Sequence, residues 1–164
     1  LRYRNLSLSF LIDVRYGGVM YSGTVSDLRV NGMAEETIGK NRTDIVDKGV
    51  KQDGTENTTA ITPYQFWSNN YSSKVSEANV FDATFVKLRE MVLSYQMPQR
   101  WFKNCFIGSL ALGVEGRNLW LMKSNVPHID PETNIFGPSA VGSGVEYSAI
   151  PTTRSWGFNI KLTF

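Results

Sequence analysis

The strict alternation of apolar and polar residues near the carboxyl end of the chain constrains the fold more than any other feature. From Ser155 to Phe164 every second residue is apolar, and the residues between them are small or polar. The apolar set is Trp156, Phe158, Ile160, Leu162 and Phe164. A period of two places alternate side chains on opposite faces of a strand, and a tilted strand of about 9–11 residues crosses a bilayer. We therefore interpret this segment as a membrane strand of the kind that closes an outer-membrane barrel.

The composition alone suits an ordinary globular domain, with 41% hydrophobic residues, 20% charged residues and a net charge of +2. No run approaches the roughly 18 consecutive apolar residues of a membrane-spanning helix. The densest run, from Leu6 to Val14, is interrupted by Ser7, Ser9 and Asp13. A helical membrane protein is thereby excluded. The nearly neutral charge argues against nucleic acid as a partner, and the single Cys105 leaves no internal disulfide.

Further segments with strand patterns precede the terminal one. The predicted strands span 2–15, 19–30, 84–96, 107–120 and 154–164. Gly17-Gly18 predicts a two-residue hairpin turn between the first two. Within 84–96 the apolar residues change parity, which predicts a β-bulge near Arg89-Glu90 because one extra residue restores the register.

Long and short connections alternate between these strands. Residues 31–82 and 121–152 are long and polar, whereas Gly17-Gly18 and 97–106 are short. A compact soluble domain seldom contains an irregular loop of more than about 15 residues without a functional reason, but outer-membrane barrels carry long extracellular loops and short periplasmic turns. We expect the two long segments to be extracellular.

The large aromatic residues agree with this alternation. Trp120 ends one predicted strand and Trp156 begins its neighbour, so both are expected at the outer membrane interface. Trp101 and Phe164 are expected at the inner interface by the same reasoning. In a soluble β-sandwich, the positions of Trp residues are not expected to correlate with the lengths of the neighbouring loops.

About five strands cannot close a barrel, because single-chain bacterial barrels have at least about 8 and an open edge leaves backbone groups unsatisfied in lipid. The chain also begins at Leu1 rather than Met and shows no secretory signal. We expect an all-β fold in which residues 1–164 are the C-terminal portion of a barrel domain. The remaining strands of this antiparallel transmembrane β-barrel would lie outside the chain.

Several short strings, read in chain order, resemble the C-terminal portion of the SusC/RagA family of TonB-dependent outer-membrane receptors of the Bacteroidetes. They are Leu8–Asp13 with Gly17-Gly18, Phe85–Arg89, Leu93–Tyr95 with Pro98, Gly116–Leu119, Asp130–Glu132, and Pro151–Arg154 leading to Phe164. Each string is short, and their order and spacing together carry the resemblance over nearly the whole chain.

The resemblance implies a barrel of about 22 strands around a plug. It further implies a SusD-like surface lipoprotein that acts as a lid, energy relayed through TonB, and import of an oligosaccharide or peptide across the bacterial outer membrane. The plug and the segment that contacts TonB are expected outside this chain. The implied work is transport, so neither an enzymatic reaction nor a cofactor is expected.

Charged residues on the predicted polar strand faces are candidates for lining the barrel lumen. They are Asp13, Arg15, Glu115, Arg117 and Lys161, with Lys87, Arg89 and Glu90 near the predicted bulge. Two interpretations stay open for each residue: contact with substrate or plug, or pairing of charges across neighbouring strands, which is the more ordinary arrangement in sheets.

An aromatic cluster in the long loop is the candidate contact for substrate or lid. It consists of Tyr64, Phe66, Trp67 and Tyr71. Aromatic rings stack on sugars and bury much area at little entropic cost, but such residues also pack a loop upon itself. Both interpretations stay open.

The sequence offers little support for metal binding or catalysis. Asp53-Gly-Thr-Glu56 lacks the spacing of an EF-hand. The lone His128, near Asp130 and Glu132, has too few ligands to predict a metal site and no evident nucleophile to serve. Two alternatives to the importer remain: a soluble secreted β-sandwich that binds carbohydrate, and a barrel receptor for metal chelates that has no lid.

Overall fold

The computed structural model describes residues 1–37, 44–72, 75–103, 106–137 and 144–164, with only the backbone described at 70–72. The chain divides into two compact units. The strand unit comprises Leu1–Tyr16, Thr84–Ser124 and Thr152–Phe164, and the insertion unit comprises Gly17–Ala83 and Asn125–Pro151. The insertion unit is thus built from two segments that interrupt the strands.

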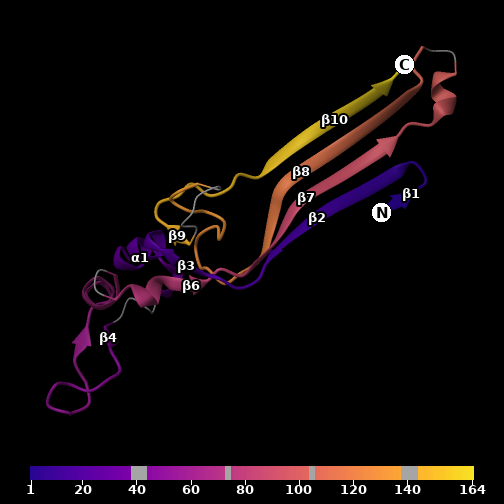
Figure 1. Cartoon of the computed structure of the whole chain (residues 1–164). Helices are drawn as coiled ribbons and strands as arrows, with labels where there is room; N and C mark the ends of the chain where they lie inside the picture. The colour runs from indigo at the N-terminus through magenta and orange to yellow at the C-terminus, as the bar shows by residue number, and fades with distance from the viewer. Residues whose placement is uncertain (38–43, 73–74, 104–105, 138–143) are drawn as a thin grey trace. The chain divides into compact units, whose positions relative to one another are not determined.

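The strand unit is one antiparallel sheet with the order β1-β2-β7-β8-β10, in which the long strands lie side by side (Figure 1). Its strands are β1 (Arg2–Tyr3), β2 (Leu6–Arg15), β7 (Phe85–Gln96), β8 (Ser109–Ser124) and β10 (Ser155–Thr163). Four of the predicted strands correspond to the four long ones. The prediction of an all-β fold is confirmed.

The register gives this sheet one apolar face and one polar face. Residues paired directly across antiparallel strands share a face. One row across the four long strands is Leu8, Leu93, Val114 and Phe158. The adjacent row is Ser7, Ser94, Gly113 and Asn159. The alternation seen in each strand of the sequence is therefore in phase across the whole sheet.

The bulge predicted near Arg89-Glu90 is confirmed. Leu11 pairs with Glu90 and Ile12 with Leu88, so the register skips Arg89. The neighbouring strand β8 has a matching irregularity at Asn118, whose φ is +50°. Because Arg89 is left out of the pairing, the alternation of side chains between the two faces shifts by one residue at the bulge. The apolar residues of β7 before and after the bulge therefore lie on the same face.

The predicted strand at 19–30 is confirmed only over residues 19–22 and is wrong from residue 23 onward. Val19–Ser22 forms the short strand β3, and Gly23–Val30 forms the helix α1. The Oγ of Ser22 accepts a hydrogen bond from the N–H of Val25 at 3.0 Å, which caps the helix and ends the strand. Sequence reasoning overlooked this N-cap.

The predicted hairpin at Gly17-Gly18 is also wrong, because β2 pairs with β7 and not with the segment that follows it. Both glycines have positive φ, +78° and +84°, and they lead into the insertion unit. The tight turn lies instead between β1 and β2, where Tyr3 pairs with Leu6 and Arg4 has a φ of +51°.

Short and long connections lie at opposite ends of the sheet. The turn end carries the β1–β2 turn and the connection 97–108, which contains the 3-10 helix η5 (Gln99–Phe102). The N–H of Gly108 donates to the carbonyl of Thr163 at 2.7 Å, which brings residue 164 to this end. Both long insertions leave from the other end, here called the insertion end. Short connections thus lie at one end of the sheet and long ones at the other, as the sequence predicted. The short turn that accompanies 97–108 is the β1–β2 turn and not Gly17-Gly18.

The insertion unit joins its two segments through a three-stranded sheet in the order β6-β3-β9. Strand β3 pairs antiparallel with β6 (Val80–Asp82) and parallel with β9 (Val145–Glu146). The apolar core consists of Met20, Ala83 and Val126, with Phe81 and Ile129 packed against it. Residues far apart in sequence therefore form one small unit.

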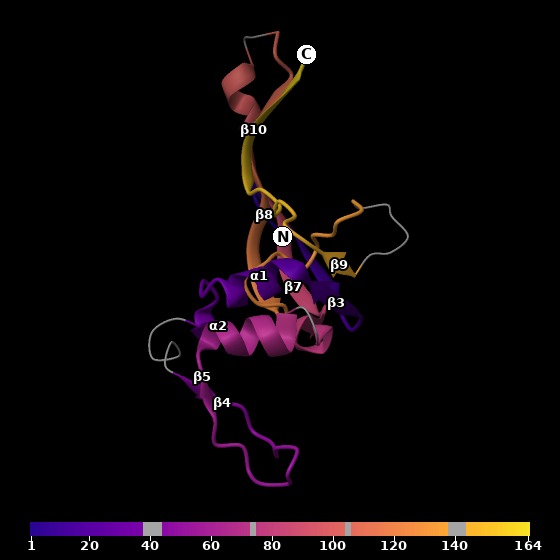
Figure 2. The same cartoon turned by 90° about the vertical axis from the view of Figure 1, so that its left-hand side faces the viewer.

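Short elements complete the insertion unit. They are η1 (Glu35–Thr37), β4 (Ile45–Val46), β5 (Ala60–Ile61), α2 (Pro63–Gln65), the π-helix η3 (Phe66–Ser72) and η4 (Ser76–Asn79). Helix α1 lies beside the α2–η3 segment (Figure 2). The segment 31–82, expected as an irregular loop, is thus partly structured. Within the described ranges, no helix combines the length and hydropathy needed to cross a membrane.

Candidate functional site

The charged residues singled out in the sequence lie on the polar face of the strand unit. Glu115 pairs with Gly157, Arg117 with Ser155 and Lys161 with Ala111. Asp13 pairs with Lys87, and Arg15 with Phe85. Each pair lies on the face opposite the row that contains Phe158. The register therefore gathers Asp13, Arg15, Glu115, Arg117 and Lys161 on one side of a single sheet.

The bulge residue Arg89 connects strands across this polar face. Its Nη2 forms an ion pair with Oδ2 of Asp13 on β2, and its Nη1 donates to Oδ1 of Asn118 on β8 at 3.0 Å. The Nδ2 of Asn118 donates in turn to the carbonyl of Thr153, just before β10, at 3.1 Å. A continuous polar chain thus reaches from β2 to the start of β10. Sequence reasoning found the bulge but missed Asn118.

Arg117 lies between two carboxylates on the polar face. Its Nε is 3.7 Å from Oε2 of Glu90, and its Nη2 is 3.8 Å from Oε1 of Glu115. The Arg117 side chain is 59% exposed. The expected pairing of charges across strands is therefore present. Because both distances are long and the Arg117 side chain is exposed, its guanidinium can also contact a solute.

The four aromatic residues expected at the membrane interfaces occupy the two ends of the sheet. Trp120 pairs with Leu88 and Trp156 with Gly116, which puts both indoles on the apolar face toward the insertion end. Trp101 lies in η5 at the turn end. Phe164 is at the same end and stacks on Phe106 with ring centroids 5.7 Å apart. Their assignment to membrane interfaces stays a prediction.

The loop aromatics separate into packed and exposed residues. Phe66 and Trp67 meet edge to face with centroids 5.1 Å apart, and both are half-buried. Tyr64 is 62% exposed and lines a groove of about 530 Å³ at the carboxyl end of α1. The side chain of Tyr71 lies outside the described part of the chain. Of the described aromatics in this cluster, Tyr64 is therefore the one placed to meet another molecule.

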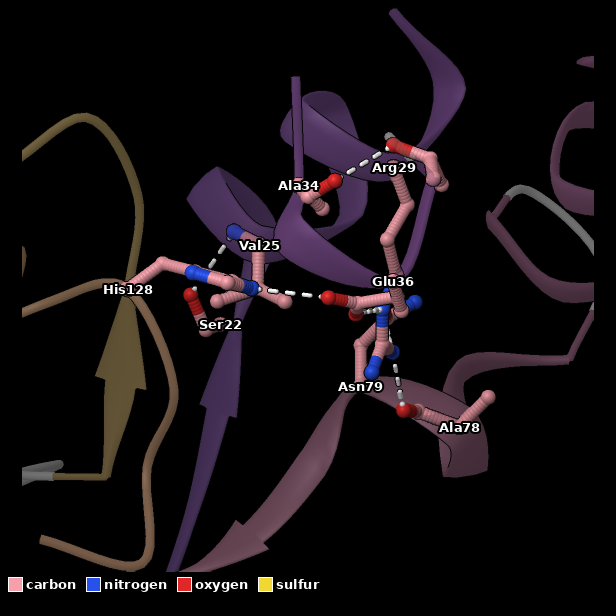
Figure 3. Close-up of polar contacts among 9 residues, drawn as sticks. Ser22, Val25, Arg29, Ala34, Glu36, Ala78, Asn79 and His128 are labelled. Atoms are coloured by element: carbon pink, nitrogen blue, oxygen red, sulfur yellow. Dashed lines mark hydrogen bonds and ion pairs between the residues drawn. The ribbon is translucent and has the colours of Figure 1, made fainter. Parts of the chain in front are cut away.

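A mostly buried arginine links several segments of the insertion unit (Figure 3). The Nε of Arg29 on α1 donates to Oε1 of Glu36 at 2.6 Å. Its Nη1 donates to the carbonyl of Ala78 at 2.6 Å and to Oδ1 of Asn79 at 2.9 Å. The guanidinium also lies 4.6 Å from the ring centroid of Trp67, a cation–π distance. Arg29 thus links α1, η1, η3 and η4.

Glu36 receives a second hydrogen-bond contact from the other insertion. Its Oε2 lies 2.8 Å from Nε2 of His128 (Figure 3). Burial raises the pKa of Glu36, but the hydrogen bonds with Arg29 and His128 outweigh it and lower the pKa from 4.5 to about 2. His128, considered above as a metal ligand, therefore serves as a contact between the two insertions.

A second carboxylate joins the same two insertions. Oε2 of Glu146 accepts from Oγ of Ser22 at 2.6 Å, and its Oε1 accepts from Oγ1 of Thr24 at 2.6 Å and from the N–H of Ala149 at 3.2 Å. Glu146 is only 1% exposed. A carboxylate this buried is held by its donors and by the N-terminus of α1. The sequence offered no local signal for it.

The segment Asp53–Glu56, considered above as a calcium loop, is held by local hydrogen bonds. Oδ1 of Asp53 accepts from the N–H of Thr55 at 3.0 Å and from its Oγ1 at 2.6 Å. These bonds lower the pKa of Asp53. Gly54 has a φ of +81°, a left-handed conformation that glycine adopts without strain. Across the described ranges, no cluster of three or more His, Cys, Asp or Glu side chains could hold a metal ion.

Comparison with known proteins gives relatives over the whole chain, although no family model matches it. The chain is 23% identical over 168 residues to TonB-dependent receptor P3 of Formosa agariphila, covering all of this chain and 15% of that protein. It matches the RagAB peptide importer in the open-open state with a TM-score of 0.59 and 17% identity, covering 98% of this chain and 16% of that one. The closed-closed state gives a TM-score of 0.60 and 17% identity, with 99% and 16% covered.

These similarities define the class of fold. The chain has the fold of a segment of a TonB-dependent receptor, as the resemblance in the sequence predicted. It spans about 15% of the length of its curated relative and 16% of the RagAB chain.

Proposed function

We propose that this chain is the C-terminal part of the barrel of a TonB-dependent outer-membrane transporter that imports a nutrient. In this proposal the strand unit is a section of the barrel wall and the insertion unit lies outside the cell. The work of the intact receptor is transport without chemistry on the cargo. Below, the parent receptor means the longer protein to which the chain would belong.

The two-faced sheet is the observation that carries the proposal. On the apolar face Phe158 is 84% exposed and Ile160 is 68% exposed, although both are large and hydrophobic. Large exposed apolar patches mark surfaces that another apolar phase covers. The length of the strands, the alternation and the aromatic residues at both ends support the proposal of a wall against lipid.

The polar face would then line the lumen. Arg117 and its two carboxylates, together with Asp13, Arg15 and Lys161, give this face many charges that face water in a barrel of this size. The chain of hydrogen bonds through Arg89 would keep the wall rigid while a plug moves within it. Energy for plug movement would come from TonB through parts of the receptor outside this chain.

The insertion unit would contact the cargo or a SusD-like surface lipoprotein. The RagAB structures are of a peptide importer, which supports a peptide cargo, and Tyr64 beside its groove suits either a peptide or an oligosaccharide. Co-purification of a lipoprotein with the parent receptor would support the lid. Its absence would favour a receptor for metal chelates that works without one.

Accessibility of single cysteines in the intact parent receptor tests the wall directly. With Cys105 and every other native cysteine of the parent receptor replaced by serine, Phe158→Cys and Ile160→Cys are compared with Asn159→Cys and Lys161→Cys. Spin labels at the first two sites should collide with oxygen dissolved in lipid. Labels at the last two should collide with a water-soluble nickel chelate.

The neighbouring positions are each other's controls, because they differ only in the face they occupy. Equal access of the nickel chelate to all four positions would contradict the membrane wall. It would favour the soluble β-sandwich, in which the parent receptor also needs no detergent. That alternative further requires a second sheet on the apolar face, and the described part of the strand unit is a single sheet.

A further inference from the structure

The turn end of the sheet carries a concentration of positive charge. Four cationic side chains, here called the cationic rim, are exposed there: Arg2, Arg4, Arg100 and Lys103. The two turns that bear them lie side by side, because the N–H of Gln96 donates to the carbonyl of Asn5 at 2.7 Å and the Nδ2 of Asn5 donates to the carbonyl of Gln96 at 2.7 Å. The charges therefore belong to one local surface.

No acidic side chain balances the cationic rim within this part of the sheet. Residues 1–12, 91–114 and 156–164, which form the half of the strand unit nearest the turn end, contain neither Asp nor Glu. The acidic residues of the strand unit are Asp13, Glu90 and Glu115, all farther along the strands toward the insertion end.

Exposed aromatic residues accompany these cations. Tyr3 is 70% exposed, Trp101 62%, and the stacked pair Phe106 and Phe164 78% each. Amphipathic and aromatic side chains beside cations are the usual arrangement where a protein crosses from hydrocarbon to headgroups. A hollow of about 520 Å³ has Arg100 and Lys103 together with Phe102 and Phe106 in its lining.

We propose that the cationic rim binds the phosphate groups of anionic phospholipids in the membrane leaflet that meets the turn end. Arg100 and Lys103 would contact the headgroup, and the aromatic residues would lie against the glycerol and upper acyl chains. The proposal rests on the proposed function, since it requires the strand unit to be in a membrane. The combination of uncompensated charge, exposed aromatics and a hollow with both kinds of lining carries it.

Native mass spectrometry of the delipidated parent receptor tests the proposal, with phosphatidylglycerol, phosphatidylcholine and inorganic phosphate as separate probes. Phosphatidylglycerol should bind more tightly than phosphatidylcholine. The double variant Arg100→Gln with Lys103→Gln should weaken phosphatidylglycerol binding by about 30-fold, the factor expected for two cations near an anionic surface. The matched control, Lys123→Gln with Arg154→Gln, removes the same charges at the insertion end and should change binding little.

Three results would overturn the proposal: equal binding of the two lipids, equal loss in both double variants, or inorganic phosphate displacing phosphatidylglycerol at equal concentration. A second measurement uses no charge substitution, so it still tests the proposal if the double variants misfold. Brominated phosphatidylglycerol should quench tryptophan fluorescence of the parent receptor more than brominated phosphatidylcholine, and Trp101→Phe should abolish the difference. Equal quenching by both lipids overturns the lipid site alone, whereas quenching by neither overturns the membrane wall.

Discussion

The strand unit repeats one simple pattern across four long strands, whereas the insertion unit depends on a few polar contacts that each occur once. In the sheet, one face is mainly apolar and the other mainly polar across β2, β7, β8 and β10, so many residues in equivalent positions contribute to each face. In the insertion unit, Arg29 and Glu146 each join several segments that are distant in sequence. The comparison teaches that the sheet tolerates substitutions that keep the polarity of each face, whereas the small polar unit is sensitive even to conservative changes at a few positions.

A charge on the apolar face should have the greatest effect on the strand unit. Phe158→Arg is expected to destabilise the folded parent receptor by about 4 kcal/mol, because Phe158 lies near the middle of β10, where a cation would face hydrocarbon. The measurement is the amount of receptor in the outer membrane that migrates as a folded barrel on unheated gels. Asn159→Arg, one residue away on the polar face, should leave that amount nearly unchanged. A similar loss in both variants would contradict the two-faced wall.

Removal of the central cation should have the next largest effect, confined to the insertion unit. Arg29→Met is expected to cost about 3 kcal/mol, because it leaves Glu36 and Asn79 without their charged donor in a mostly buried site. Thermolysin should then cleave within 17–83 much faster in the parent receptor, while the barrel still migrates as folded. Arg154→Met, at an exposed position, is the control. Unchanged cleavage would show that redundancy extends to the insertion unit.

A neutral replacement of the buried carboxylate should loosen the first turn of α1. Glu146→Gln is expected to cost about 2 kcal/mol, because its amide presents a donor where Ser22 or Thr24 already donates. Hydrogen exchange at the amide of Val25 should accelerate by about 30-fold. Glu132→Gln in the same insertion is the comparison. Equal protection of Val25 in wild type and in Glu146→Gln would exclude this role for Glu146.

Two substitutions of Asn118 should separate the cost of its left-handed backbone conformation from the loss of its hydrogen bonds. Asn118→Ala and Asn118→Gly both remove the contacts with Arg89 and Thr153, but only glycine accepts a φ of +50° without strain. We expect the alanine variant to be about 1 kcal/mol less stable than the glycine variant. Urea midpoints for loss of folded migration would measure this. Equal midpoints would mean that the left-handed backbone carries no strain.

Acid should weaken the insertion unit through Glu36. The folded-state pKa of Glu36, about 2, is below its usual value of 4.5. This contribution to stability is therefore complete above about pH 4.5 and is lost as the pH falls toward 2. Protection of 17–83 from an acid protease should decline over that interval in wild type. Glu36→Gln should show less decline, and an identical decline would assign acid sensitivity to other groups.

The strand unit could be read from the sequence because its signals are local and repeated. The alternation around Phe158 identified β10, and the change of parity near Arg89 identified a bulge. The charged residues of the polar face followed from the same period of two. Asn118 was missed because a left-handed residue inside a strand has no pattern of its own.

The insertion unit could not be read in this way. The capped start of α1 at Ser22 was overlooked because the preceding residues look like a strand, and the pairing of β3 with β6 and β9 depends on long-range contacts. His128 and Glu36 are 92 positions apart in sequence. No local pattern relates such residues, so their contact is known only once the chain is folded.

The sequence by itself determined which residues share a face of each long strand, because side chains in a strand alternate regardless of its neighbours. The tertiary structure decided which strands are neighbours. In the folded chain β2 pairs with β7, and the tight turn lies at Arg4 rather than at Gly17-Gly18. The two distant insertions contact each other through β3 and Glu146. Pairing depends on backbone hydrogen bonds and side-chain contacts between distant segments, and such contacts leave no period along a single chain.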